Sequence, residues 1–250
     1  MKPSERQSII VRTLRNEGRV SVDKLVSQLG TSPETIRRDL TALSTLGKLQ
    51  KVHGGAILPR DIGEGAFQER IKENVADKLK IAGKACKLIS SGDSLFIDTG
   101  STTLIFAEEL ASIDNLTVVT NSADIAKILG AQSTSQVYLV GGRYNAENHE
   151  TFGSLAISQL QQFQMDYACI TAGAVDANVG VMDFNIEEAE VAKTMVEQAH
   201  KTIVLADESK LSKTAPFKVS SLEKINYLVT NSTTDIELRN ALEKQNIEIL

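Results

Sequence analysis

The sequence contains few of the residues that cross-link or rigidify small secreted proteins. Among its 250 residues are two cysteines, four prolines and no tryptophan, and aromatic residues make up 4%. Cys86 and Cys169 lie far apart and form no Cys-x-x-Cys pair, so the chain offers neither a disulfide framework nor a cysteine-rich zinc site. The three histidines are scattered without His-x-x-x-His spacing, which argues against a metal site.

Long apolar stretches are absent as well. No run approaches the roughly 18 apolar residues that a membrane span requires, and the first residues form a polar, amphipathic pattern. We therefore expect a cytoplasmic protein with no membrane partner. The nucleotide-binding pattern Gly-x-x-x-x-Gly-Lys-Ser/Thr and the Gly-x-Ser-x-Gly elbow of hydrolases are also missing. The sequence thus predicts no cofactor, no metal and no catalytic residue.

The charge of the chain is unevenly distributed. Residues 1–60 contain 11 lysines and arginines against 5 acidic residues, a balance of +6, whereas residues 61–250 contain 16 against 27, a balance of −11. A basic head on an acidic body is typical of a polyanion-binding module joined to a second domain. Chance clustering of solvated charges is the alternative explanation. The length of the chain allows one large domain or two small ones.

Three helical patterns and a short alternating segment fill the head. Each helical pattern starts at a serine that can cap a helix and ends at a glycine. We predict helices over residues 4–18, 21–30 and 33–46. The segment after the third helix alternates and breaks at Gly54-Gly55, which predicts a β-hairpin wing. The sequence therefore predicts a winged helix-turn-helix domain over residues 1–57, with the helix-turn-helix itself at about 20–39.

The third helix has two distinct faces. Ile36, Leu40 and Leu43 fall on one side and are expected to pack on the first two helices. The opposite side is polar and basic, as a helix that enters the DNA major groove must be. A solvated helix face is the alternative for the two arginines, but the turn, helix and wing together favour DNA binding. The candidate DNA contacts of helix and wing are Ser32, Thr35, Arg37, Arg38, Thr41, Lys51 and His53.

Short apolar runs alternate with helical patterns in the rest of the chain. The expected strands are 94–98, 116–120, 136–140, 167–171, 202–206, 225–229 and 247–250. The expected helices are 75–89, 103–110, 123–129, 155–162, 186–199 and 233–244. Such alternation predicts βαβ units and a mostly parallel sheet covered by helices on both faces. We expect an α/β domain over residues 75–250, joined to the head by a linker over 58–74.

Polar residues follow several of these strands, where parallel α/β sheets bind their ligands. The first strand runs through Asp98-Thr99-Gly100-Ser101-Thr102-Thr103 into a helix and so offers hydroxyls and backbone N–H groups to a phosphate. Together the strand ends predict a phosphosugar pocket. Taken alone, each cluster is also explained as a helix cap, a plain turn or a surface lysine. The candidate effector-binding residues are Asp98, Gly100, Ser101, Thr102, Thr103, Asn121, Gly142, Asp176 and Lys210.

Several motifs in the head and the body together resemble those of a known family. In the head they are Ser32-Pro33-Glu34-Thr35-Ile36-Arg37-Arg38-Asp39-Leu40 and His53-Gly54-Gly55-Ala56. In the body they are the 98–103 stretch, Val119-Thr120-Asn121-Ser122, Gly141-Gly142, Glu188-Ala189-Glu190-Val191 and Ala206-Asp207-Glu208-Ser209-Lys210. With these motifs the chain resembles the DeoR family of bacterial transcription regulators. The resemblance covers nearly the whole chain, and members of that family are about this length.

The resemblance implies a sensor domain similar to ribose-5-phosphate isomerase. In the family a phosphorylated sugar binds this domain, weakens DNA binding and relieves repression. Carried over to this chain, residues 100–103 hold the phosphate, while Asp98, Asn121, Asp176 and Lys210 face sugar oxygens. We therefore expect a repressor of a carbohydrate catabolic operon. Its partners are double-stranded operator DNA, a phosphorylated sugar effector and its own copies in a homodimer or homotetramer.

An aldose-ketose sugar-phosphate isomerase with the same fold is the alternative function. That reaction needs a carboxylate base and a group that stabilises the enediolate. The acidic Asp-Gly-Ala-Asp-Glu stretch of the isomerase corresponds here to Ala172-Gly173-Ala174-Val175-Asp176, so two carboxylates are lost. Weak activity from Asp176, Glu187 or Glu188 with Lys210 stays open. A passive adaptor that uses the head for protein contacts is a third possibility.

Overall fold

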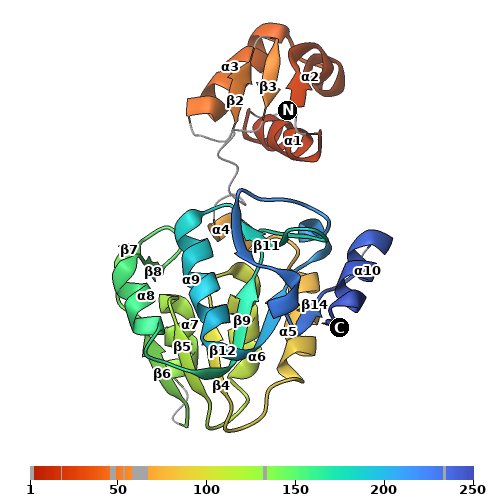
Figure 1. Cartoon of the computed structure of the whole chain (residues 1–250). Helices are drawn as coiled ribbons and strands as arrows, with labels where there is room; N and C mark the ends of the chain where they lie inside the picture. The colour runs from red at the N-terminus through yellow and green to blue at the C-terminus, as the bar shows by residue number, and fades with distance from the viewer. Residues whose placement is uncertain are drawn as a thin grey trace. The chain divides into compact units, whose positions relative to one another are not determined.

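The computed structural model describes residues 3–17, 19–45, 49–52, 54–57, 67–131, 134–232 and 235–250 (Figure 1). The chain divides into two units, a head over Met1–Ile62 and a second unit over Gly63–Leu250. No helix among these residues is long and apolar enough to cross a membrane.

The head consists of three helices and a small antiparallel sheet. In chain order its elements are α1 (Pro3–Glu17), β1 (Arg19–Ser21), α2 (Val22–Leu29), α3 (Pro33–Thr45), β2 (Gln50–Val52) and β3 (Gly55–Ile57). Ser21 caps α2 by accepting a hydrogen bond from the Lys24 backbone, and Gly30 ends it in the left-handed conformation, at φ 60°. The sheet order is β1-β3-β2, so the strand after α1 pairs with the predicted wing. This is the expected winged helix-turn-helix.

A seven-stranded parallel sheet forms the centre of the second unit. Its order is β15-β14-β12-β9-β4-β5-β6, and every neighbouring pair is parallel. The strands are β4 (Ser94–Ile97), β5 (Thr117–Thr120), β6 (Gln136–Leu139), β9 (Met165–Thr171), β12 (Ala199–Leu205), β14 (Tyr227–Val229) and β15 (Glu248–Ile249). Each lies within a few residues of a strand predicted from the sequence.

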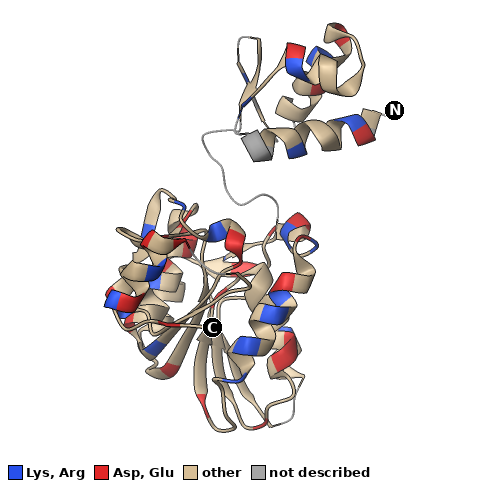
Figure 2. Ribbon diagram, turned by 90° about the vertical axis from the view of Figure 1, so that its right-hand side faces the viewer, with Lys and Arg blue, Asp and Glu red and all other residues tan. Residues whose placement is uncertain are grey.

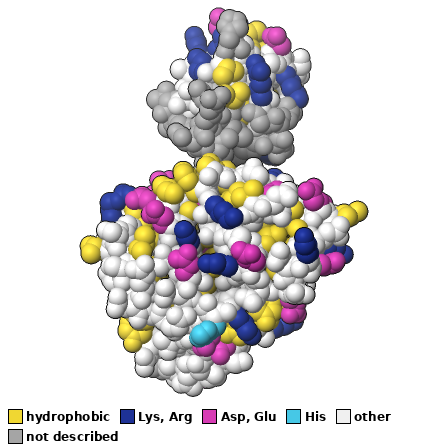
Figure 3. Space-filling view, in the orientation of Figure 1, with side chains coloured by type: hydrophobic (Ala, Val, Ile, Leu, Met, Phe, Trp, Pro, Cys, Tyr) yellow, Lys and Arg dark blue, Asp and Glu magenta, His cyan; other side chains and the backbone are white. Residues whose placement is uncertain are grey.

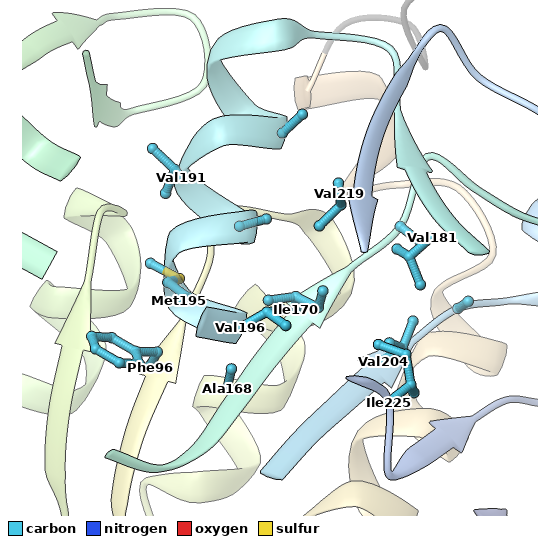
Figure 4. Packing of buried hydrophobic residues seen from close by; sticks show 14 of the residues in the cluster. Phe96, Ala168, Ile170, Val181, Val191, Met195, Val196, Val204, Val219 and Ile225 are labelled. Atoms are coloured by element: carbon cyan, nitrogen blue, oxygen red, sulfur yellow. The ribbon is translucent and has the colours of Figure 1, made fainter. Parts of the chain in front are cut away.

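Helices cover both faces of this sheet, as predicted. They are α4 (Phe67–Arg70), α5 (Val75–Cys86), α6 (Ser101–Leu110), α7 (Ala123–Gly130), α8 (Ser154–Leu160), α9 (Ile186–Glu197) and α10 (Ile236–Lys244). One buried cluster joins α5, α6 and α7 to the sheet, and another joins α8, α9 and α10 to the opposite face. In Figure 4, Phe96 of β4, Ile170 of β9 and Met195 of α9 belong to the second cluster. Charged residues lie mainly on helices and loops, and the strands carry few (Figure 2).

The order of the strands reverses beside β4. The chain passes from β4 through β5 to β6 on one side, then returns to place β9 on the other side of β4 and continues through β12. At such a switch point the connections leave the two strands in opposite directions and open a crevice at their carboxyl ends. The topology therefore places a ligand site beyond β4 and β9.

The structure adds elements that the sequence did not predict. A hairpin forms from β7 (Arg143–Asn145) and β8 (Glu150–Phe152), and a small antiparallel sheet from β10 (Ala174–Asp176), β11 (Gly180–Asp183) and β13 (Phe217–Ser220). Two short 3-10 helices, Glu208–Lys210 and Leu222–Lys224, complete the unit.

The linker predicted over 58–74 differs from the structure in its second half. Residues 67–74 contain α4 and the turn into α5, and Phe67 is 1% exposed. These residues belong to the second unit because Phe67 buries its ring there, an anchor that the non-periodic sequence concealed. Residues 58–66 lie outside the described residues.

We expect Phe96→Ala to lower the free energy of unfolding of the second unit by about 3–5 kcal/mol, since its wholly buried ring leaves a cavity between sheet and helices. Urea denaturation followed by circular dichroism measures this change. Leu155→Ala is the control, because that side chain is 65% exposed and its loss should change stability by less than about 0.5 kcal/mol. Equal effects of the two substitutions would contradict the packing described here.

Candidate functional site

A cavity lies at the carboxyl ends of β4, β9 and β12, at the switch point of the sheet. It encloses about 470 Å³ of empty space, open water at its mouth included. Its lining comes from α4, α5, the start of α6 and the segments that follow β9 and β12. The lining residues are Arg70, Glu73, Asn74, Lys78, Ser101, Thr102, Thr171, Ala172, Leu205, Asp207, Ser209 and Lys210.

The first turn of α6 forms one wall of this cavity. Gly100 is the N-cap residue, and the side chains of Ser101 and Thr102 are buried beside the cavity. A Cβ atom on Gly100 would lie 2.6 Å from the side chain of Thr171, so only glycine fits at this position. Backbone N–H groups in the first turn of a helix have no partner within the helix and favour an anion. This wall can therefore bind a phosphate.

Three basic side chains line the same cavity. Arg70 comes from α4, Lys78 from α5 and Lys210 from the segment after β12. Burial lowers the pKa of Lys78, and the positive charges of Lys210 and Arg70 act in the same direction, while Asp207 opposes them. Glu73 and Asp207 also line the cavity, so its three cations outnumber two carboxylates, and the balance of charge favours an anion.

Asp98 lies behind this wall and joins two strands. Both of its carboxylate oxygens accept from the Thr171 backbone N–H, at 3.1 and 3.0 Å, and the Thr171 hydroxyl donates to one of them at 3.3 Å. Burial raises the pKa of Asp98, and the charges of Asp183 and Glu188 add to this, against the hydrogen bonds from Thr171. Asp98 thus fixes the end of β9, and with it Thr171, against the end of β4.

Two other candidate effector residues hold loops together instead of lining the cavity. The Thr103 hydroxyl is wholly buried and donates to the backbone oxygens of Asp98 and Gly100, at 2.8 and 3.1 Å. Asn121 accepts from the Thr99 backbone N–H at 3.1 Å and donates to the Thr151 backbone oxygen at 3.2 Å. Both side chains therefore stabilise the shape of the site.

Gly142 and Asp176 also lie outside the cavity lining. A Cβ atom on Gly142 would lie 2.6 Å from the backbone oxygen of Phe152, so this glycine permits the close approach of β7 and β8. The Asp176 carboxylate accepts from the backbone N–H groups of Asn178 and Val179, both at 2.9 Å, in the turn from β10 to β11. Of the nine candidates, the cavity brings together Ser101, Thr102 and Lys210.

Sequence reasoning missed Arg70 and Lys78. Both precede the first strand of the parallel sheet, so a search of strand ends does not reach them. A signal for Lys78 was present, because it occupies the buried stripe of α5 with Ile81, Ala82 and Ala85. A lysine within an otherwise apolar stripe indicates either a partner or a ligand. No comparable pattern marks Arg70.

The outward face of α3 forms a second candidate site, in the head. Ser32 accepts from the Thr35 backbone N–H at 3.3 Å and caps the helix, while Arg37 and Arg38 are exposed. The Lys51 amine of β2 donates to the Thr41 hydroxyl at 2.8 Å, which ties the wing to the helix. Figure 3 shows Lys and Arg side chains exposed on this unit. His53 lies outside the described residues.

Buried polar contacts position α3. Asp39 is 5% exposed and accepts hydrogen bonds from Arg6 and Gln7 of α1. Its carboxylate therefore faces the interior of the head, where it does not repel DNA phosphates. The exposed carboxylate of Glu34 lies in the first turn of α3, and the charges of Arg37 and Arg38 outweigh it, so the outward face keeps its basic character.

Comparison with known protein families identifies both units of the chain. The family model described as DeoR-like helix-turn-helix domain matches residues 6–61, and that described as DeoR C terminal sensor domain matches residues 73–232. The chain belongs to the DeoR family. The predicted transcription regulator, with a DNA-binding head and an α/β sensor domain, is confirmed.

Several relatives in this family are named as repressors. The glycerol-3-phosphate regulon repressor of Haemophilus influenzae is 30% identical, over 100% of this chain and 97% of the relative. The transcriptional repressor AccR of Agrobacterium fabrum is 33% identical, over 96% and 94%. The repressor GlcR of Bacillus subtilis is 30% identical, over 100% and 96%. These names favour a DeoR-family regulator over the alternative of an isomerase.

Solved structures also resemble parts of the chain. Ribose 5-phosphate isomerase A from Methanocaldococcus jannaschii is 23% identical with a TM-score of 0.41, over 56% of this chain and 55% of that one. The structure of eIF2B beta from Chaetomium thermophilum is 18% identical with a TM-score of 0.48, over 71% of this chain and 56% of that one.

Proposed function

We propose that this DeoR-family protein is a cytoplasmic repressor of a carbohydrate catabolic operon, and that a phosphorylated sugar releases it from operator DNA. The observation that carries the proposal is the convergence of Arg70, Lys78 and Lys210 on the first turn of α6 in one cavity. A helix N-terminus with three cations binds a dianionic phosphate far better than a neutral sugar. The phosphate is therefore the part of the effector that this cavity holds.

The rest of the effector lies toward Thr171 and Asp207, which line the same cavity. Asp207 caps the short helix that carries Lys210 by accepting from the Ser209 backbone N–H at 2.8 Å, so it orients that lysine. Hydroxyl groups next to a phosphate meet carboxylate, hydroxyl and backbone groups here, which suits a sugar. The names of the relatives, which include a glycerol-3-phosphate regulon repressor, support an effector of this class.

Operator binding uses the outward face of α3 and the wing. Arg37, Arg38 and Thr41 reach the major groove, and Lys51 lies beside the DNA backbone, where a lysine contacts phosphates. One small helix-turn-helix covers little DNA, so two heads on symmetric half-sites bind more tightly than one. The protein therefore acts as a homodimer or homotetramer.

A fluorescence-polarisation titration tests this function. The full-length protein is titrated against labelled DNA from upstream of its own gene and neighbouring genes, with and without a panel of sugar phosphates. We expect tight binding to one fragment and its release by one sugar phosphate, but not by the same unphosphorylated sugar. Conversion of a sugar phosphate without any DNA binding would contradict the proposal and favour the isomerase.

Lys210→Met should give a protein that binds the operator normally but is not released by the effector. Loss of this charged contact should reduce effector affinity by about 1.5–3 kcal/mol. Isothermal titration calorimetry of the full-length protein measures the affinity. The control is Lys213→Met, an exposed lysine three residues further on that does not line the cavity. A normal response of Lys210→Met would place the phosphate elsewhere.

As the pH is raised, effector affinity should begin to fall at a lower pH than it would if the cavity held a lysine of ordinary pKa. Burial lowers the pKa of Lys78 below 10.5, so this side chain loses its charge, and its attraction for phosphate, as the pH rises through that lowered value. Calorimetric titrations over a pH series measure the decline. Lys78→Met should bind weakly and lack this component of the pH dependence. An unchanged pH profile in the variant would show that Lys78 does not bind the phosphate.

Arg38→Ala should weaken operator binding by about 1–3 kcal/mol and leave effector affinity unchanged, because Arg38 belongs to the head unit. If Arg38 contacts a phosphate, the slope of log affinity against log salt should also fall by about one. Lys127→Ala, which removes one positive charge from α7, is the control and should keep wild-type affinity. Equal loss of DNA and effector binding in a folded Arg38 variant would contradict this assignment.

A further inference from the structure

Carboxylates gather beside the cavity, around the β7–β8 hairpin and the start of α9. Asn148, in the hairpin loop, donates to Glu150 at 3.0 Å and to Glu188 at 3.2 Å, and so links the hairpin to α9. Asn185 also donates to Glu188, at 3.1 Å, and its backbone N–H donates to Asp183 at 2.8 Å. Amide groups thus hold these carboxylates in fixed orientations.

Glu150 is the buried member of this group. Its side chain is 0% exposed, and Oε1 accepts from Asn148 and, at 3.4 Å, from Asn145. The other oxygen, Oε2, has no hydrogen-bond donor among the described residues. The hydroxyl of Thr99, which is 9% exposed, likewise lacks a hydrogen-bond partner there. Buried polar atoms without partners are rare and costly, so two of them near one site indicate a missing ligand group.

Neither Thr99 nor Glu150 lines the cavity, but backbone and hydrogen bonds join both residues to its wall. Thr99 lies between Asp98 and Gly100, in the loop that leads into α6. Asn121 joins the Thr99 backbone to the backbone of Thr151, the neighbour of Glu150. Arg70 lines the cavity, and its charge also lowers the pKa of Glu150, against the upward effect of burial and of Asp183. Glu150 therefore lies within electrostatic reach of the phosphate-binding end.

We propose that Glu150, with Glu188 and the Thr99 hydroxyl, forms a second subsite that binds a hydroxyl group at the non-phosphorylated end of the effector and so determines which sugar phosphate acts. The inference rests on the proposed function, since it needs a phosphate in the cavity. A carboxylate oxygen accepts a hydrogen bond from a sugar hydroxyl, and a threonine hydroxyl donates or accepts one as the sugar requires. The second subsite therefore discriminates between sugar phosphates that bind equally well at the phosphate-binding end of the cavity.

The hairpin loop is bonded to the same carboxylate. Oε2 of Glu150 is buried in this structure, so a hydroxyl reaches it only when the carboxylate or the residues around it shift. The Asn145 and Asn148 amide hydrogen bonds to Glu150 hold that loop in place, together with the Asn148 bond to Glu188. Effector binding therefore exchanges contacts within the hairpin for contacts to the sugar.

The test uses Glu150→Gln in the full-length protein. The amide keeps an oxygen for Asn145 and Asn148 and replaces the orphaned acceptor with a donor. Isothermal titration calorimetry compares inorganic phosphate, aldose and ketose phosphates of five and six carbons, and singly deoxygenated analogues of the probe that binds best. Glu147→Gln is the matched control, because Glu147 lies exposed in the same loop. Glu188→Gln is the second variant if Glu150→Gln unfolds.

We expect the wild-type protein to bind one sugar phosphate more tightly than inorganic phosphate. Glu150→Gln should bind the sugar phosphate about 10- to 100-fold more weakly than the wild-type protein does, and should bind inorganic phosphate equally well. One deoxygenated analogue should bind the wild-type protein and the variant equally, since it lacks the hydroxyl from which Glu150 accepts a hydrogen bond. Glu147→Gln should behave like the wild type, and Glu188→Gln should show the same selective loss.

Other outcomes overturn the inference. Unchanged sugar phosphate affinity in a folded Glu150→Gln protein would remove Glu150 from the site. Parallel loss of inorganic phosphate and sugar phosphate would give Glu150 a structural role only. A wild-type protein that binds every sugar phosphate no better than inorganic phosphate would exclude a second subsite. Failure of the proposed function looks different, because then the wild-type protein binds neither inorganic phosphate nor any sugar phosphate.

Discussion

The hydrogen bonds from Thr171 to the buried Asp98 carboxylate hold together the two strand ends on which the sensor site depends. Strand order reverses between β4 and β9, so no helix crosses over the gap at their carboxyl ends. Asp98 closes this gap at its base, and the glycine two residues later starts α6 against Thr171 without a steric clash. The cavity depends on this junction, and so do the phosphate-binding turn and the second subsite that we propose for it.

Electrostatics divide the sensor site into two ends. One end carries Arg70, Lys78 and Lys210 around a helix N-terminus, although the unit as a whole is acidic. The other end carries amide-bound carboxylates, of which Glu150 is wholly buried. A phosphorylated sugar has the complementary arrangement, an anion at one end and hydroxyl donors at the other. Burying the charged groups of either end without a partner costs free energy. A ligand that pairs with the charges of both ends therefore has a strong effect on the equilibrium between conformations.

Sequence periodicity predicted the strands of the large sheet well, because buried parallel strands read as short apolar runs between helical patterns. The small sheet and the β7–β8 hairpin were not predicted, since their strands show no clear alternation. Strand-end motifs located Ser101, Thr102 and Lys210 but also selected Thr103 and Asn121, whose bonds are internal. A motif records which residues follow a strand, whereas only the packing shows which of them faces the ligand. Arg70 and Lys78 reach the cavity from a segment that precedes the sheet.

We propose that binding of a phosphorylated sugar by the sensor unit is coupled to binding of DNA by the head. A linkage experiment measures this coupling on one preparation of the protein. Operator affinity is determined with and without the sugar phosphate, and sugar phosphate affinity with and without the operator. Binding free energies at two coupled sites must change by the same amount in either order. We expect each ligand to weaken the binding of the other by the same amount, about 1–3 kcal/mol, a common range for such coupling. Tight binding of both ligands with no mutual effect would contradict the coupling.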